Sequence, residues 1–132
     1  MRKLLFLSYW IGIVADGLAT VVLFSPTVAN MVFQPRTFEI SANFLYVSRI
    51  AGALMLGWTV LLFWAQLKPI ERADILLITL FPVVTLLAAA AGLVVQSNEI
   101  AISRILPMFI FYLVVYCTFI PSFIWAKRQK VV

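Results

Sequence analysis

Two ionisable side chains lie inside long apolar runs of this sequence, Asp16 within residues 4–24 and Arg49 within residues 43–66. A charge near the centre of a membrane helix costs roughly 2.5 to 3.5 kcal/mol, so each should face protein or trapped water rather than lipid. At about 1.5 Å per residue, Asp16 lies about 12 Å from the far end of its run, and Arg49 lies about 9 Å from the start of its own. For antiparallel neighbours these depths predict an Asp16–Arg49 ion pair.

A tyrosine extends this predicted group into an intramembrane polar cluster of Asp16, Arg49 and Tyr112. Counted from the start of the fourth apolar run, Tyr112 reaches about 10 Å into the membrane. Two interpretations stay open. The charges neutralise each other and fix the helix register, or the cluster binds a polar headgroup, an anionic ligand or a proton.

Small residues stand one or two helical turns from each of the two charges, and they predict where the first two helices touch. Gly12 stands one turn from Asp16, and Gly52, Ala53 and Gly57 follow Arg49 by one or two turns. Because small side chains let helix backbones approach closely in a membrane, we expect helix packing through these four positions.

The residue inventory narrows the chemistry that this chain can perform. It has no histidine and only one cysteine, Cys117, so we expect no metal site, no haem, no internal disulfide and no Ser/His triad. The acid-base candidates are Asp16, Arg49 and the tyrosines, and arginine is a poor proton shuttle. We therefore assign no catalytic residue and no cofactor, and we expect a protein that is not an enzyme.

The elements that position these residues are membrane spans. The chain is 64% hydrophobic and 11% charged, with a mean hydropathy of +1.09, which excludes a soluble domain. We expect an all-α, integral membrane four-helix bundle with antiparallel up-down spans in one domain, residues 1–132. Pro82 interrupts the third span, and residues 28–33 (VANMVF) are expected to form a short interfacial segment. The expected spans are residues 4–24, 43–66, 75–96 and 105–126.

The basic residues beside the spans predict the orientation. Arg36 and Arg104 flank one side, and a larger group flanks the other, so the positive-inside rule puts the larger group and both termini in the cytoplasm. The basic residues behind the net charge of +5 then set the orientation and contact lipid headgroups, and we expect no binding of nucleic acid. The larger group comprises Arg2, Lys3, Lys68, Arg72, Lys127, Arg128 and Lys130.

The stretch SRIAGALMLGWTVLLFWAQLKP, which follows LFSPTVANMVF, resembles the small four-span bacterial membrane proteins grouped as DoxX-like. The resemblance covers residues 1–95 and lies in a first helix that ends near a proline and a second in which Arg49 precedes spaced glycines. It implies an inner-membrane four-helix bundle, a special role for Arg49, and an accessory role beside sulfur or quinone redox systems.

Two functions from different classes follow. The first is a non-enzymatic bundle that binds membrane lipid, a lipid-like or quinone-like ligand, or a partner subunit, as a homo-oligomer or in a larger membrane complex. The second is a small proton-coupled exporter of lipophilic cations that uses Asp16. An exporter needs a carboxylate that is free to exchange a proton for a cation. An Arg49 side chain at matching depth would instead pair with the carboxylate and keep it ionised.

Overall fold

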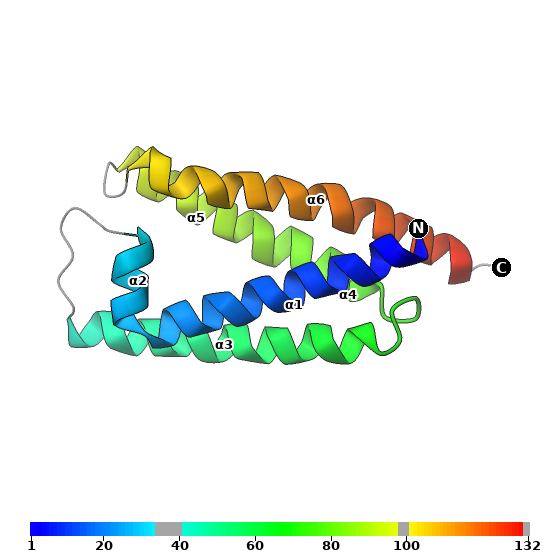
Figure 1. Cartoon of the computed structure of the whole chain (residues 1–132), viewed down its shortest axis with the longest axis horizontal. Helices are drawn as coiled ribbons and strands as arrows, with labels where there is room; N and C mark the ends of the chain where they lie inside the picture. The colour runs from blue at the N-terminus through cyan, green and yellow to red at the C-terminus, as the bar shows by residue number, and fades with distance from the viewer. Residues whose placement is uncertain (34–40, 98–100, 131–132) are drawn as a thin grey trace.

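The computed structural model describes residues 1–33, 41–97 and 101–130, and these residues form helices and short turns without a strand. The predicted all-α four-helix architecture is confirmed, with helices that run up and down (Figure 1). α4, η1 and α5 follow each other without a break and make up the third long helix. The elements are α1 (Arg2–Phe24), α2 (Pro26–Phe33), α3 (Ala42–Gln66), α4 (Asp74–Ile78), the π-helical segment η1 (Thr79–Val84), α5 (Thr85–Gln96) and α6 (Ile102–Lys130).

Large apolar side chains cover the outside of all four long helices. Leu18, Leu54, Leu86 and Leu113, one from each, are all more than 60% exposed. Each of these helices is also long and apolar enough to cross a bilayer. Lipid is the solvent that suits such a surface, which indicates a multi-pass membrane protein.

A proline ends the first span and begins the short helix α2. The residue before a proline is pushed out of the helical region, and Ser25 has extended backbone angles, φ −115° and ψ 98°. Pro26 then occupies the first helical position, where its missing N–H costs no hydrogen bond. The chain turns at this point, and α2 lies across one end of the bundle (Figure 1).

The third span contains a wide turn around Pro82. A proline inside a helix has no N–H for the preceding turn, and here the helix widens to π geometry over η1. The Thr85 hydroxyl lies 2.9 Å from the carbonyl oxygen of Leu80 and 2.6 Å from the hydroxyl of Tyr116. The Leu80 carbonyl oxygen thus accepts from both the backbone N–H and the hydroxyl of Thr85, and Tyr116 joins this turn to α6.

The two ends of the bundle differ in charge. Both termini and the turn of residues 67–73 lie together at one end, here called the N/C end, and α2 lies at the opposite end, here called the α2 end (Figure 1). The seven basic residues predicted to share one side all belong to segments at the N/C end. Arg104 lies in the first turn of α6 at the α2 end, and Arg36 lies outside the described residues. Which end faces the cytoplasm stays a prediction.

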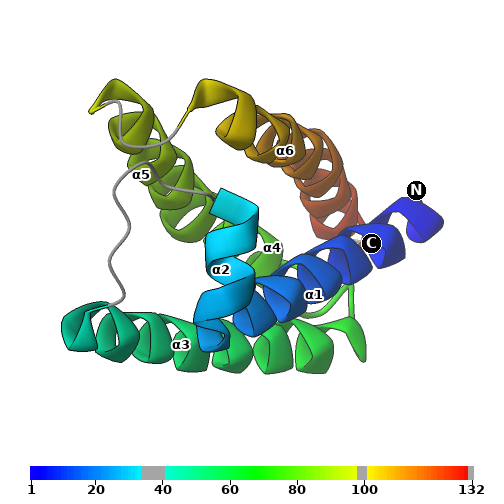
Figure 2. The same ribbon diagram turned by 60° about the vertical axis from the view of Figure 1, so that its left-hand side comes forward.

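Packing is tighter toward the N/C end. There the core contains the fully buried Tyr9 of α1, Leu62 of α3, Leu76 of α4 and Phe119 of α6. The Ser8 and Ser122 hydroxyls, 2.9 Å apart and both buried, join α1 to α6 in the same half. Toward the α2 end, α3 and the α5–α6 pair diverge (Figures 1 and 2).

Candidate functional site

Three contacts define how α3 lies against α1. The Ser48 hydroxyl donates to the carbonyl oxygen of Leu23 at 2.5 Å. Gly52 packs against the Phe24 ring, and Gly12 packs against Leu62. The helices are therefore antiparallel neighbours, and α3 extends beyond the last turn of α1 at the α2 end.

This register separates Asp16 from Arg49, and the ion pair that the sequence predicts does not form. Arg49 follows Ser48 and so stands level with the end of α1, whereas Asp16 lies seven residues before Leu23, about 10 Å further along the helix. The Arg49 side chain is exposed. The depth prediction failed because it placed the end of the first apolar run level with the start of the second, although α3 begins six residues before Ser48, the residue that lies beside Leu23.

Asp16 instead lines a pocket between the four long helices, with a volume of about 370 Å³. Tyr112 of α6 lines the same pocket, so the structure brings together two of the three predicted cluster residues. The walls are otherwise apolar. They consist of Ala15, Leu18 and Ala19 of α1, Met55 of α3, Leu87 of α5, and Pro107, Met108 and Phe111 of α6.

Asp16 is half-buried, and one oxygen of its carboxylate is buried without a partner. Its Oδ2 atom has no hydrogen-bond partner among residues 1–33, 41–97 and 101–130. Two threonine hydroxyls are used within their own helices, because Thr20 donates to the backbone carbonyl of Asp16 and Thr59 donates to that of Met55. A buried polar oxygen without a partner is costly, so a bound group that donates a hydrogen bond or carries a positive charge would be stabilised here.

The rim of the pocket is open to the surroundings of the bundle. Leu18, Leu87 and Phe111 line it and are 63%, 39% and 37% exposed. They belong to α1, α5 and α6, so the opening faces the space that lipid would occupy. An apolar molecule could enter sideways from the bilayer and present one polar group to Asp16.

Only two of the four small residues lie on the predicted packing face. Gly12 and Gly52 are buried in contact with neighbouring helices, but Ala53 and Gly57 are exposed. The reason is helical geometry, because Ala53 is turned about 100° from Gly52 and thus leaves the α1 interface. A methyl group added at Gly57 would meet nothing within 4 Å.

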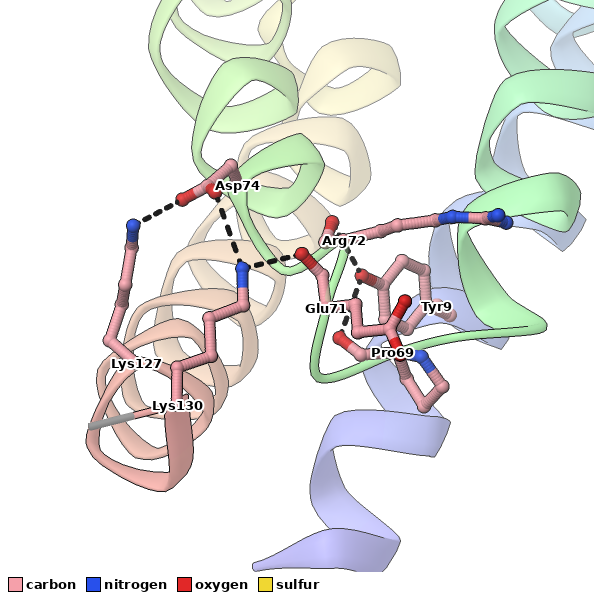
Figure 3. Close-up of polar contacts among 7 residues, drawn as sticks. All are labelled: Tyr9, Pro69, Glu71, Arg72, Asp74, Lys127 and Lys130. Atoms are coloured by element: carbon pink, nitrogen blue, oxygen red, sulfur yellow. Dashed lines mark hydrogen bonds and ion pairs between the residues drawn. The ribbon is translucent and has the colours of Figure 1, made fainter. Parts of the chain in front are cut away.

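A second set of polar contacts, which the sequence did not predict, joins the segments at the N/C end (Figure 3). The buried Tyr9 hydroxyl lies 3.0 Å from the carbonyl oxygen of Arg72 and 3.3 Å from that of Pro69, so α1 holds the turn between α3 and α4. The Arg72 guanidinium stacks 3.4 Å above the Trp64 ring. One feature of the sequence indicates the Tyr9 contact: this tyrosine lies two turns from the start of the first span, at the level of an expected loop.

Lysines at the end of α6 bind the start of α4 at the same end. Lys127 Nζ lies 2.8 Å from one carboxylate oxygen of Asp74, and Lys130 Nζ lies 3.5 Å from the other (Figure 3). Lys130 also donates to the backbone carbonyl of Glu71. These contacts hold helix ends together, and we assign them a structural role.

Comparison with protein-family models, curated proteins and solved structures finds no match. The assignment of function therefore depends on the pocket itself.

Proposed function

We propose that this multi-pass membrane protein is not an enzyme and binds a lipid-like or quinone-like molecule in the pocket that contains Asp16. The observation that carries the proposal is the unpartnered Oδ2 atom of Asp16 in an otherwise apolar pocket. A hydroxyl or amine of the ligand would donate to this oxygen, so the quinone-like candidate would bind in its reduced, hydroxyl-bearing form.

The size and lining of the pocket support a small amphiphile. Its volume of about 370 Å³ falls within the range of roughly 300 to 1,000 Å³ for small-molecule sites, which are mostly apolar with a few placed polar groups. Because the rim is open, a long tail could extend into the bilayer. Phe111 and Tyr112 form an aromatic part of the wall, and the Tyr112 ring also packs against Phe109, with centroid distances of 6.3 Å to Phe111 and 6.4 Å to Phe109.

The exporter of lipophilic cations is the second candidate. The sequence predicted an Asp16–Arg49 pair, which argues against an exporter, and the absence of that pair removes this objection. A carboxylate that exchanges a proton for a cation must not be occupied by an arginine, and Arg49 stands about 10 Å away along the helix. Cells that express the parent would then resist tetraphenylphosphonium, and Asp16→Asn would abolish that resistance while the protein remains in the membrane.

The wider setting belongs to the same proposal. We place the protein in a bacterial inner membrane with both termini in the cytoplasm, on the charge asymmetry between the two ends. The DoxX-like resemblance adds an accessory role beside a membrane complex or as a homo-oligomer. The exposed Ala53 and Gly57 would let a partner helix approach α3 closely.

Mass spectrometry of molecules that co-purify with the protein tests the binding function. Ala19→Phe fills the pocket, and Ala53→Phe makes the same change on the exposed face of α3. We expect one small amphiphile to be enriched in the parent and in Ala53→Phe but lost from Ala19→Phe. Equal recovery from all three proteins would contradict the proposal.

A further inference from the structure

A second pocket lies at the N/C end, on the side of α1 that faces the end of α3. It has a volume of about 600 Å³ and is lined by Arg2, Lys3, Phe6, Gln66 and Pro69. It shares no residue with the pocket of Asp16. Its chemistry is also different, because two cationic side chains border it.

The helix register creates this pocket. Tyr9 already stands level with the turn that follows α3, since its hydroxyl donates to the carbonyl oxygen of Pro69. The first two turns of α1 therefore project beyond Gln66, where α3 ends. The step between the projecting turns and the end of α3 leaves a notch with α1 as its wall.

The notch is positively charged. Arg2 and Lys3 are exposed and form no ion pair within the described ranges, whereas the nearby acid, Glu71, is 3.1 Å from Lys68. An arginine and a lysine side by side bind phosphate oxygens through charge-assisted hydrogen bonds.

An apolar surface leads from the notch along α1 toward the middle of the membrane. Phe6 is 49% exposed and Trp10, one turn further, is 39% exposed, with ring centroids 6.2 Å apart. Aromatic residues of this kind mark the level of lipid headgroups. A phosphate in the notch would thus have its fatty chains beside exposed aromatic rings.

We infer that the notch binds the headgroup phosphate of an anionic phospholipid from the surrounding bilayer. Arg2 and Lys3 bind the phosphate oxygens, Gln66 offers its amide to the headgroup, and the acyl chains follow Phe6 and Trp10. This site is independent of the ligand proposed for the Asp16 pocket, and it would attach the N/C end of the bundle to one leaflet.

Native mass spectrometry of the purified full chain in mild detergent tests the inference, with dioleoylphosphatidylglycerol as the anionic probe and dioleoylphosphatidylcholine as the zwitterionic one. Arg2→Gln removes a notch cation, and Arg128→Gln removes an exposed arginine of the last turn of α6 that does not line the notch. Neither side chain is buried, so both variants should fold, and circular dichroism checks this.

We expect the first phosphatidylglycerol to bind several-fold more tightly than phosphatidylcholine. Arg2→Gln should weaken it by about fivefold, the effect of one basic side chain near an anionic lipid surface. Arg128→Gln should leave it unchanged, and an excess of inorganic phosphate should not displace it. Equal binding of the two lipids, or equal loss in both variants, would overturn the inference. Displacement by inorganic phosphate would show a phosphate site that does not require the lipid, and would overturn it too.

Discussion

The Ser48 hydroxyl donates a hydrogen bond of 2.5 Å to the carbonyl oxygen of Leu23, and this contact fixes the level at which α3 passes α1. Its consequence is that the two charges of the apolar runs occupy different environments. Arg49 stands level with the end of α1, where a long side chain can reach the headgroups. Asp16 lies deeper, in a pocket, and its Oδ2 atom has no hydrogen-bond partner among the described residues.

Substitutions of the two charges should therefore act independently. The free energy of unfolding of Asp16→Asn combined with Arg49→Gln should equal the sum of the single changes within about 0.5 kcal/mol, because the side chains do not touch. Unfolding in mixed micelles measures it. Asp74→Asn with Lys127→Gln serves as a positive control, since that pair is 2.8 Å apart and should show a coupling of about 0.2 to 1 kcal/mol. If the double variant Asp16→Asn, Arg49→Gln were more stable than the sum of the single changes predicts, the two side chains would form an ion pair after all.

Bulk at the α1–α3 contact should destabilise the bundle. A methyl group at Gly52 would lie 2.9 Å from the Phe24 ring and 3.3 Å from Leu23 Cβ, so Gly52→Leu should cost about 1 to 3 kcal/mol through overpacking. Gly57→Leu adds the same bulk to an open surface and should cost much less. Thermal unfolding in detergent compares the two variants. Equal melting temperatures would show that α3 presents another face to α1.

Loss of the Tyr9 hydroxyl should loosen the N/C end. Tyr9→Phe removes the donor to the carbonyl oxygens of Pro69 and Arg72 and should cost about 0.5 to 1.5 kcal/mol, the net contribution of a typical hydrogen bond, because the Arg72 oxygen still accepts from the backbone N–H of Ile75. The exposed Tyr46 provides the control Tyr46→Phe, which should have little effect. Hydrogen exchange of residues 67–73 should rise only in Tyr9→Phe. Unchanged exchange in this turn would show that other contacts hold it.

The spans could be predicted from the sequence because each depends on local properties. Hydropathy and length identify a membrane helix, and Ser25 followed by Pro26 marks the end of the first one. The helix ends predicted at residues 24, 66 and 96 are the ends of α1, α3 and α5, whereas the fourth span, predicted at residues 105–126, is longer at both ends in α6 (Ile102–Lys130). The interfacial segment predicted around residues 28–33 falls in α2.

The site could be predicted only in part, because it depends on how far one helix slides past another. Asp16 and Tyr112 were recognised as polar residues inside apolar runs, and both line the pocket. The predicted depth of Arg49 is wrong because hydropathy does not show how far α3 extends beyond the last turn of α1. Met55 and Leu87, which complete the walls, look like any lipid-facing residue in the sequence.

The most direct test of the Asp16 pocket as a binding site is the thermal stabilisation of the purified protein by decylubiquinol, a reduced quinone with a short tail. A ligand at one hundred times its dissociation constant stabilises the folded state by about 2.7 kcal/mol. We predict stabilisation of the parent and of Ala53→Phe, none of the pocket-filling Ala19→Phe or of Asp16→Leu, and a reduced effect on Asp16→Asn, whose amide oxygen still accepts a hydrogen bond. The same rise in melting temperature in the parent, Ala19→Phe and Asp16→Leu would contradict the account, because the quinol would then bind elsewhere.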